Sequence, residues 1–223
     1  MSPAPPSRFD QGLEERGFAT LIVVAKSPRP GWVKTRLSPH YSPRQAADLA
    51  IAALADTLDV VARAPARRRL LVLDGDDFRW RRPGLEIVAQ SGGGLDERLA
   101  HAFSLVRPGT GACLLVGMDT PQVTTRLLTM QNSAADAWFG PTEDGGFWAL
   151  GFAEPPDPAW LLGVPMSRAD TGAEQRRRLT EAGLAVVDLP TLRDVDTAHD
   201  VPLVAEQARN SRFALLAEGL AAA

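Results

Sequence analysis

The chain has one cysteine and three histidines among its 223 residues, and this scarcity limits the chemistry it can support. Cys113 lies in the apolar run 112–116, so neither a disulfide framework nor a cysteine zinc site is available. His40, His101 and His199 have no ligand-like spacing. No Gly-x-Ser-x-Gly sequence occurs, which disfavours a serine hydrolase. A Walker-type Gly-x-x-x-x-Gly-Lys-Ser/Thr sequence is also missing, which disfavours a P-loop nucleotide hydrolase.

Long apolar runs and a strong charge of one sign are missing as well. No stretch approaches the roughly 18 apolar residues of a membrane span. Residues 1–17 contain prolines and lack the apolar centre of a signal peptide. The net charge of −3 gives no overall basicity that would attract nucleic acid or a membrane surface. We therefore expect a cytoplasmic protein that neither binds nucleic acid nor enters a membrane, with a disordered tail over residues 1–17.

The rest of the chain, residues 18–223, alternates short apolar runs with stretches of helical spacing. The apolar runs predict strands at 21–25, 70–73, 86–89, 112–116, 138–141, 147–152 and 185–189. Apolar residues at helical spacing and helix-start signals predict helices at 43–61, 95–106, 124–134, 171–182 and beyond 199. This order is typical of a single α/β domain with a mostly parallel central sheet and helices on both faces.

A basic loop follows the first predicted strand. Residues 26–37 read Lys-Ser-Pro-Arg-Pro-Gly-Trp-Val-Lys-Thr-Arg-Leu, in which the prolines and Gly31 prevent regular structure. A diphosphate or triphosphate needs several cations to neutralise its charge. The loop offers four, namely Lys26, Arg29, Lys34 and Arg36. The alternative is an ordinary solvated basic loop, because Lys and Arg side chains are normally exposed.

Two acidic segments follow later strands. Asp119 comes directly after the strand predicted at 112–116, and Pro121 then turns the chain away. Such an aspartate is often only a cap or turn residue. A second segment, Asp194-Val195-Asp196-Thr197, also follows a strand and a turn. If the strand ends lie together, two carboxylates and a nucleotide diphosphate would hold Mg²⁺ or Mn²⁺, which prefer oxygen ligands.

A third acidic segment, Glu143-Asp144-Gly145-Gly146, lies between two predicted strands. One interpretation is a tight hairpin turn, which needs glycine but has no need of two adjacent carboxylates. The other is a site where glycine lets the backbone approach a ligand closely. In that case Asp144 could orient or deprotonate an acceptor hydroxyl, as a general base must.

Together these segments resemble one bacterial family. Residues 30–37, 117–121, 140–146 and 194–197 occur in the order found in the GT-A-like radical-SAM/selenodomain-associated glycosyltransferases, and the resemblance covers about residues 19–200. The fold of that family is similar to the nucleotide-diphospho-sugar transferase superfamily. The superfamily also contains molybdenum cofactor guanylyltransferases and phospholactate guanylyltransferases.

The resemblance implies roles for several residues. Nucleotide phosphates would contact the loop that contains Lys26, Gly31, Lys34, Thr35 and Arg36. A divalent Mg²⁺ or Mn²⁺ would be held by Asp119 and Asp196. The acceptor would face Glu143, Gly145 and Gly146, with Asp144 as the candidate catalytic residue. The chain departs from the family at Gln122, where an acid is frequent, and at Met166, where a tryptophan is frequent; both departures concern the acceptor.

These observations predict a transferase that uses a nucleotide-activated donor, a small-molecule acceptor and a divalent metal. Glycosyl transfer from a nucleotide sugar is the first expectation. The same loop and metal pair would also serve nucleotidyl transfer, in which an NTP reacts with a phosphorylated acid and pyrophosphate is released. A nucleotide-binding protein without turnover is the third possibility, suggested by Gln122 and Met166.

Overall fold

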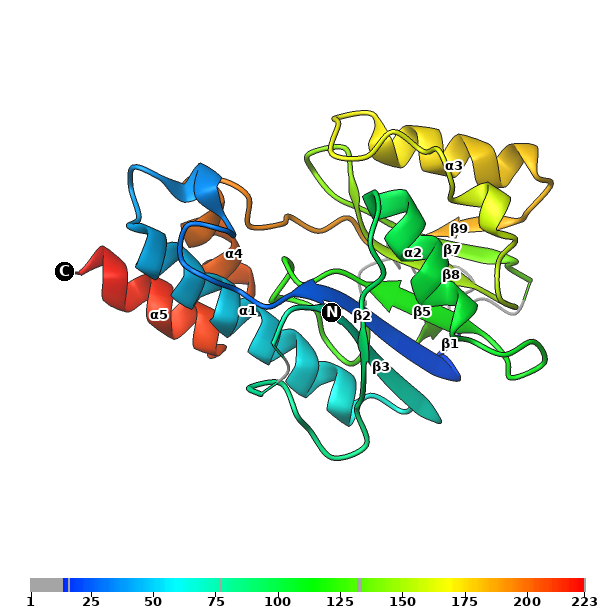
Figure 1. The fold of residues 1–223 in the computed structure, drawn as a ribbon, viewed down its shortest axis with the longest axis horizontal. Coiled ribbons are helices and arrows are strands. Elements are labelled where there is room, and N and C mark those ends of the chain that lie inside the picture. Colours follow the sequence, from blue (N-terminus) through cyan, green and yellow to red (C-terminus); the bar gives the residue numbers. More distant parts are fainter. Residues whose placement is uncertain (1–13, 16, 77, 132–133, 223) are drawn as a thin grey trace, which may run out of the picture.

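A seven-stranded sheet runs through the centre of the molecule (Figure 1). The computed structural model describes residues 14–15, 17–76, 78–131 and 134–222. The strand order across the sheet is β4-β3-β2-β5-β8-β7-β9. The bounds are β2 Thr20–Lys26, β3 Arg68–Asp74, β4 Glu86–Ala89, β5 Cys113–Val116, β7 Ala137–Pro141, β8 Phe147–Phe152 and β9 Val186–Asp188.

The sheet is mostly parallel, as the sequence predicted. Neighbouring strands pair in parallel except at β8, which is antiparallel to both β5 and β7. Parallel strands that are covered on both faces are apolar along their whole length. In β2, residues 20–25 are all buried. Because β2 and β5 pair in parallel, their carboxyl ends lie at the same edge of the sheet. The basic loop follows β2 at this edge, and Asp119 follows β5.

Helices cover both faces of this sheet, again as predicted. The side chains of β2 alternate between the two faces. Leu21 and Val23 pack with α1, Pro43–Arg63, in one apolar cluster. Ile22 and Val24 pack in a second cluster with α2, Leu95–Ser104, and α3, Thr171–Glu181. The two faces of β2 thus contribute side chains to both of these apolar clusters.

The start of α1 shows why the helix begins where it does. Ser42 accepts a hydrogen bond from the backbone N–H of Gln45, and the Gln45 side chain accepts one from the backbone of Ser42. This reciprocal capping box satisfies two backbone donors, and Pro43 occupies the first turn, where no donor is needed. The predicted helix at 43–61 is confirmed and continues to Arg63.

The last two helices, α4 Asp200–Gln207 and α5 Arg212–Ala221, lie beside the sheet, where α5 packs on both α1 and α4 (Figure 1). Phe213 of α5 lies in a third apolar cluster with Leu49 of α1. The same cluster contains Leu37 from the basic loop and Val195 from the second acidic segment. The helical prediction beyond residue 199 is therefore confirmed, and these helices anchor two loops of the candidate site.

The helix predicted at 124–134 is wrong. Residues 125–129 form turns, and Met130–Gln131 forms the short strand β6. Thr124 and Thr125 are β-branched and favour helices weakly, whereas Leu128 and Met130 are buried in the first cluster. Tertiary packing of apolar residues thus overrides the helical spacing. Residues 132 and 133 of this prediction lie outside the described part of the chain.

The predicted tail over residues 1–17 falls largely outside the description, which omits residues 1–13 and 16. Glu14–Glu15 forms the strand β1, which pairs antiparallel with β6. The other differences are small: α2 ends at Ser104 instead of residue 106, and β9 is shorter than predicted at each end. Among the described residues, no helix is long and apolar enough to cross a bilayer.

Candidate functional site

Lys34 lies at the carboxyl edge of the sheet, between two aspartates. Its Nζ is 2.8 Å from Oδ1 of Asp119 and 3.1 Å from Oδ1 of Asp196. The side chain of Lys34 is only 9% exposed. Arg36 reaches the same group from outside, with Nη1 3.5 Å from Oδ2 of Asp196 and a side chain that is 70% exposed. The structure therefore brings together two predicted phosphate-binding cations and the two predicted metal ligands.

The conformation of the basic loop explains why Lys34 points inward. Trp32 N–H donates to the carbonyl of Arg29, which closes a turn. Lys34 itself has a φ of 50°, in the left-handed region that few residues other than glycine adopt. A short 3-10 helix follows at Thr35–Leu37, and Leu37 is fully buried in the third apolar cluster. The buried leucine holds the end of the loop against α1.

Asp119 is fixed by backbone hydrogen bonds on both sides of it. Gly117 N–H donates to the carbonyl of Trp148 in β8, which continues the pairing of the sheet beyond β5. The carbonyl of Asp119 accepts a 3.0 Å hydrogen bond from Val195 N–H. This bond ties the second acidic segment to the strand end. Strand β9 is separated from β5 by β8 and β7, so the segment that follows β9 crosses back to the end of β5 and brings Asp196 to Asp119.

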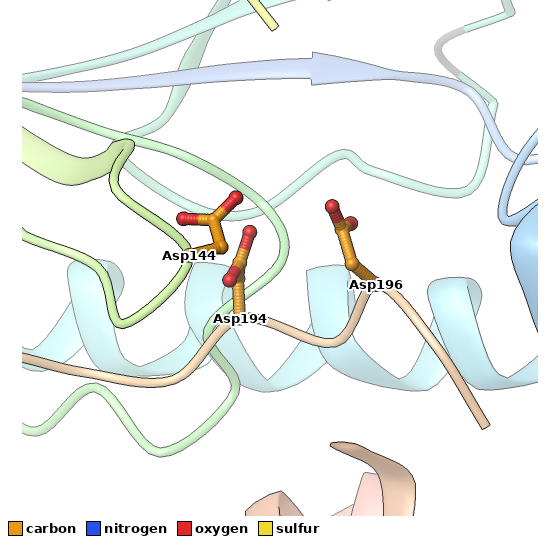
Figure 2. A group of neighbouring side chains, drawn as sticks. All are labelled: Asp144, Asp194 and Asp196. Carbon is orange, nitrogen blue, oxygen red and sulfur yellow. The ribbon is translucent and has the colours of Figure 1, made fainter. Parts of the chain in front are cut away.

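Three carboxylates form a compact group next to Lys34. Oxygen atoms of Asp144, Asp194 and Asp196 all lie within 4.8 Å of one another. Figure 2 shows the three side chains pointing to the same side of the acidic segment. Side chains alternate along an extended chain. Because Val195 is buried in the third cluster, its two neighbours face the opposite way, toward the turn that carries Asp144.

The charges in this group affect one another. Burial raises the pKa of Asp194 to about 7, and repulsion from Asp196 and Asp144 adds to the effect. Burial alone would lower the pKa of Lys34, but attraction by Asp119 and Asp196 outweighs it, so the pKa is raised. The site therefore holds more carboxylate charge than Lys34 balances. Additional positive charge would stabilise it.

The donor atoms of the site fit a divalent cation of the Mg²⁺ or Mn²⁺ type. All of the converging acids offer carboxylate oxygen, and hard cations prefer oxygen ligands. Asp196 is common to both arrangements, because one of its oxygens contacts Lys34 and it also belongs to the three-carboxylate group. The acidic group is thus consistent with use of a divalent metal.

The turn between β7 and β8 is the hairpin that one interpretation of the sequence predicted. Gly145 has a φ of +90°, and a Cβ there would lie 1.9 Å from the carbonyl oxygen of Ala169. Gly146 N–H donates to Oδ1 of Asp144 at 2.9 Å, and the Thr142 hydroxyl is 2.5 Å from the same oxygen. The conformation and close packing of the turn therefore explain the glycines without a ligand. The two hydrogen bonds fix the position of the Asp144 carboxylate. The catalytic and acceptor roles stay predictions.

Glu143 has a partner that the sequence did not indicate. Its carboxylate pairs with the guanidinium of Arg193, whose Nη1 lies 2.9 Å from Oδ1 of Asp200. Asp200 in turn accepts hydrogen bonds from the backbone N–H and the hydroxyl of Thr197. Glu143 therefore helps to hold the second acidic segment in place.

The remaining predicted phosphate-binding residues are Lys26, Gly31 and Thr35. Lys26 ends β2 and is in register with Asp74 of β3. Gly31 and Thr35 are exposed on the loop. Within the ranges that the structure describes, none of these three residues hydrogen-bonds to the site aspartates. Their role in binding phosphate stays a prediction.

Asp194 is the residue that the sequence analysis did not assign to the metal site. Its signal was present, because an Asp-x-Asp pattern places both acids on one side of an extended chain. Gln122 also has a structural role that its sequence position did not indicate. Its Nε2 donates to the carbonyl of Arg193 at 2.5 Å and to Oε1 of Gln207 at 3.3 Å. An amide can donate there, whereas a carboxylate could not.

Comparison with solved structures places this fold among nucleotide-using enzymes. The chain is similar to a proposed nucleotide-diphospho-sugar transferase from Desulfovibrio desulfuricans G20, with 30% identity and a TM-score of 0.78, over 91% of this chain and 96% of that one. It also resembles a CMP:2-keto-3-deoxy-manno-octonic acid synthetase in complex with CTP, with 12% identity and a TM-score of 0.54, over 90% and 99% of the two chains.

A cytidylyltransferase from Leptospira borgpetersenii gives a similar match, with 12% identity and a TM-score of 0.53 over 92% of this chain and 94% of that one. At such low identity these two matches describe the fold alone. No curated protein matches the chain. A family model matches residues 49–168, which is more than half of the chain. The chain therefore belongs to the family described as "Uncharacterized protein conserved in bacteria (DUF2064)".

Proposed function

We propose that this protein is a metal-dependent transferase that moves a sugar from a nucleotide-diphospho-sugar donor to a small-molecule acceptor. The observation that carries the proposal is the meeting of Lys34 and Arg36 with Asp119 and Asp196 at the carboxyl edge of the sheet. Ligands of open α/β sheets bind at this edge. The 30% identity to a proposed nucleotide-diphospho-sugar transferase supports the choice of donor.

The donor diphosphate would contact Lys34 and Arg36, because ammonium and guanidinium groups neutralise phosphate oxygens. Asp119 and Asp196 would hold the cation, and Asp194 would support it from its place beside Asp196 in the three-carboxylate group. When bound, a divalent cation of this kind stabilises the negative charge that develops on the leaving diphosphate. We also propose that the chain is a member of the radical-SAM/selenodomain-associated subfamily, as the sequence resemblance implied.

Asp144 would act as the general base on the acceptor hydroxyl. Both of its hydrogen-bonding neighbours, Thr142 and Gly146, contact Oδ1, which leaves Oδ2 to take the proton. The acceptor oxygen would form a bond to the anomeric carbon while the bond from that carbon to the diphosphate breaks. The nucleoside diphosphate would leave with the electron pair, and the acceptor proton would pass to Asp144.

A thermal-shift panel of nucleotide sugars and NTPs, each with MnCl₂, MgCl₂ or EDTA, tests the proposal. A ligand that binds only the folded protein raises the melting temperature. We expect one nucleotide sugar to stabilise the protein only when metal is present, and Asp119→Asn to abolish this shift. Glu206→Gln is the matched control, because Glu206 is an exposed acid of α4 that pairs with the nearby Arg209, away from the site.

Enzyme assays with the donor so found distinguish the alternatives. Release of nucleoside diphosphate with an acceptor supports glycosyl transfer. Release of pyrophosphate from an NTP would instead indicate that the activity is nucleotidyl transfer. Tight metal-dependent binding without turnover on a broad acceptor panel would indicate a nucleotide-binding protein, and an unchanged metal-dependent shift in Asp119→Asn would contradict the assigned metal site.

A further inference from the structure

Lys34 contacts both Asp119 and Asp196, the two aspartates proposed to hold the cation. Its ammonium nitrogen contacts Oδ1 of Asp119 at 2.8 Å and Oδ1 of Asp196 at 3.1 Å, and its side chain is 9% exposed. These are two of the oxygen donors that a divalent cation would need. An ammonium group and a divalent cation repel each other at such short range, so the two compete for the same oxygens.

Lys34 also needs a new partner if it leaves this position. A buried charge that loses its counter-ion is strongly destabilised, so displacement of the ammonium by a cation alone would be unfavourable. The diphosphate of a nucleotide donor would supply the replacement anion next to the same loop. Displacement would then exchange one ion pair for another instead of breaking it.

We propose that Lys34 is an internal substitute for the divalent cation: without donor its ammonium closes Asp119 and Asp196 to metal, and it transfers to the donor diphosphate when metal binds. The inference rests on the proposed function, because it assumes that metal and diphosphate share this site. It makes the two ligands mutually dependent, since each would improve the binding of the other by the same factor.

The loop can permit this transfer without unfolding. Leu37 stays buried in the third apolar cluster, while the long, flexible stem of Lys34 lets the ammonium move by side-chain rotation. Arg36 provides a natural comparison on the same loop. Its Nη1 lies 3.5 Å from Oδ2 of Asp196, and its side chain is 70% exposed, whereas that of Lys34 is 9% exposed.

Equilibrium dialysis of the full chain against MnCl₂, with and without sodium pyrophosphate, tests the inference. Free Mn²⁺ and its pyrophosphate complex equalise across the membrane, so the excess on the protein side is bound metal. We expect the unaltered protein to bind Mn²⁺ weakly alone and about tenfold more tightly with pyrophosphate, within the usual range of coupling between sites.

Lys34→Met should bind Mn²⁺ alone about tenfold more tightly than the unaltered protein and gain little from pyrophosphate. Arg44→Met is the matched control, because the exposed Arg44 side chain pairs with Asp48 on α1, away from the site, and this variant should bind Mn²⁺ like the unaltered protein in both conditions. Lys34→Gln is the second variant if Lys34→Met does not fold by circular dichroism. Equal or weaker Mn²⁺ binding by the folded Lys34 variant would overturn the inference, because the metal would then bind without displacing the ammonium.

The result separates this inference from the proposed function. If the unaltered protein binds Mn²⁺ and a nucleotide sugar but the Lys34 variant gains no affinity, only the role of Lys34 is wrong. If no protein binds Mn²⁺ in either condition, the metal-dependent function and the role of Lys34 are both overturned.

Discussion

Asp194 lies beside two other carboxylates, and its ionisation is coupled to folding. Burial, with repulsion from Asp196 and Asp144, raises its pKa to about 7. An unfolded aspartate has a pKa of about 4. Between these two pKa values the folded protein binds one more proton than the unfolded protein. The contribution of Asp194 to the free energy of unfolding therefore falls as the pH rises from about 4 to about 7. The destabilisation is absent below the lower value and complete above the upper one.

We expect Asp194→Asn to raise the melting temperature at about pH 8 by a few degrees and by a smaller amount at about pH 5, because the folded Asp194 is neutral there and only part of the pH-dependent difference between the folded and unfolded states has developed. Scanning fluorimetry in EDTA measures both values without bound metal. Asp188→Asn is the control, because Asp188 forms an exposed ion pair with Arg176 and should respond alike at both pH values. An equal effect of Asp194→Asn at both pH values would contradict the role of burial.

At the same scale, the sequence predicted the residue types of the site better than their partners. It indicated that acids following different strands converge if the strand ends lie together, and the structure places Asp119 and Asp196 on one ammonium group. The left-handed backbone of Lys34 and the buried Leu37 bring the ammonium group of Lys34 to these aspartates. Residue spacing does not encode either feature. The roles of these residues in binding and catalysis stay predictions.

Helix α5 links the stability of the protein to the geometry of the site at the scale of elements. Phe213 is fully buried in the cluster that also contains Leu37 and Val195. Truncation of a buried phenylalanine typically costs about 3–5 kcal/mol. We expect Phe213→Ala to lower the free energy of unfolding by an amount in this range, measured by guanidinium denaturation.

Leu215→Ala on the same helix is the matched control for Phe213→Ala. Leu215 is 63% exposed, so its truncation should change the free energy of unfolding by less than about 0.5 kcal/mol. A similar loss in both variants would show that α5 contributes through its own helical stability, and that the third apolar cluster does not determine the effect.

The elements that the sequence predicted well have local causes. The buried run of β2 and the capping box of α1 are signals that neighbouring residues provide themselves. The helix predicted at 124–134 was wrong because Leu128 and Met130 are recruited by distant apolar residues. The reversed direction of β8 depends likewise on the hairpin with β7 and on the space beside β5, and apolar content alone does not specify direction.

Cys113 provides a measure of the unfolding of the whole molecule. It lies in β5 at the centre of the sheet, it is fully buried, and burial raises the pKa of its thiol to about 12. The thiolate is the reactive form, so the native thiol should react very slowly with a disulfide reagent. Because the chain has one cysteine, labelling reports a single position.

We expect labelling of Cys113 across a guanidinium titration to give the same midpoint as far-ultraviolet circular dichroism. The reason is that a central strand opens only when the sheet as a whole unfolds. Unaltered protein in buffer is the control, and rapid labelling there would contradict the burial of β5. A labelling midpoint below that of circular dichroism would indicate that the sheet opens before the helices do.

The third apolar cluster also has a consequence for the order in which the protein can be completed during synthesis. Chains emerge from the ribosome from the N-terminus, and folding proceeds as segments become available. Leu37 precedes α1, yet it belongs to the same apolar cluster as Phe213 in α5. The loop with Lys34 is translated early, but its anchor is covered only after Arg212–Ala221 has emerged. The edge of the sheet that carries the candidate site is therefore completed only after all strands of the seven-stranded sheet have been made.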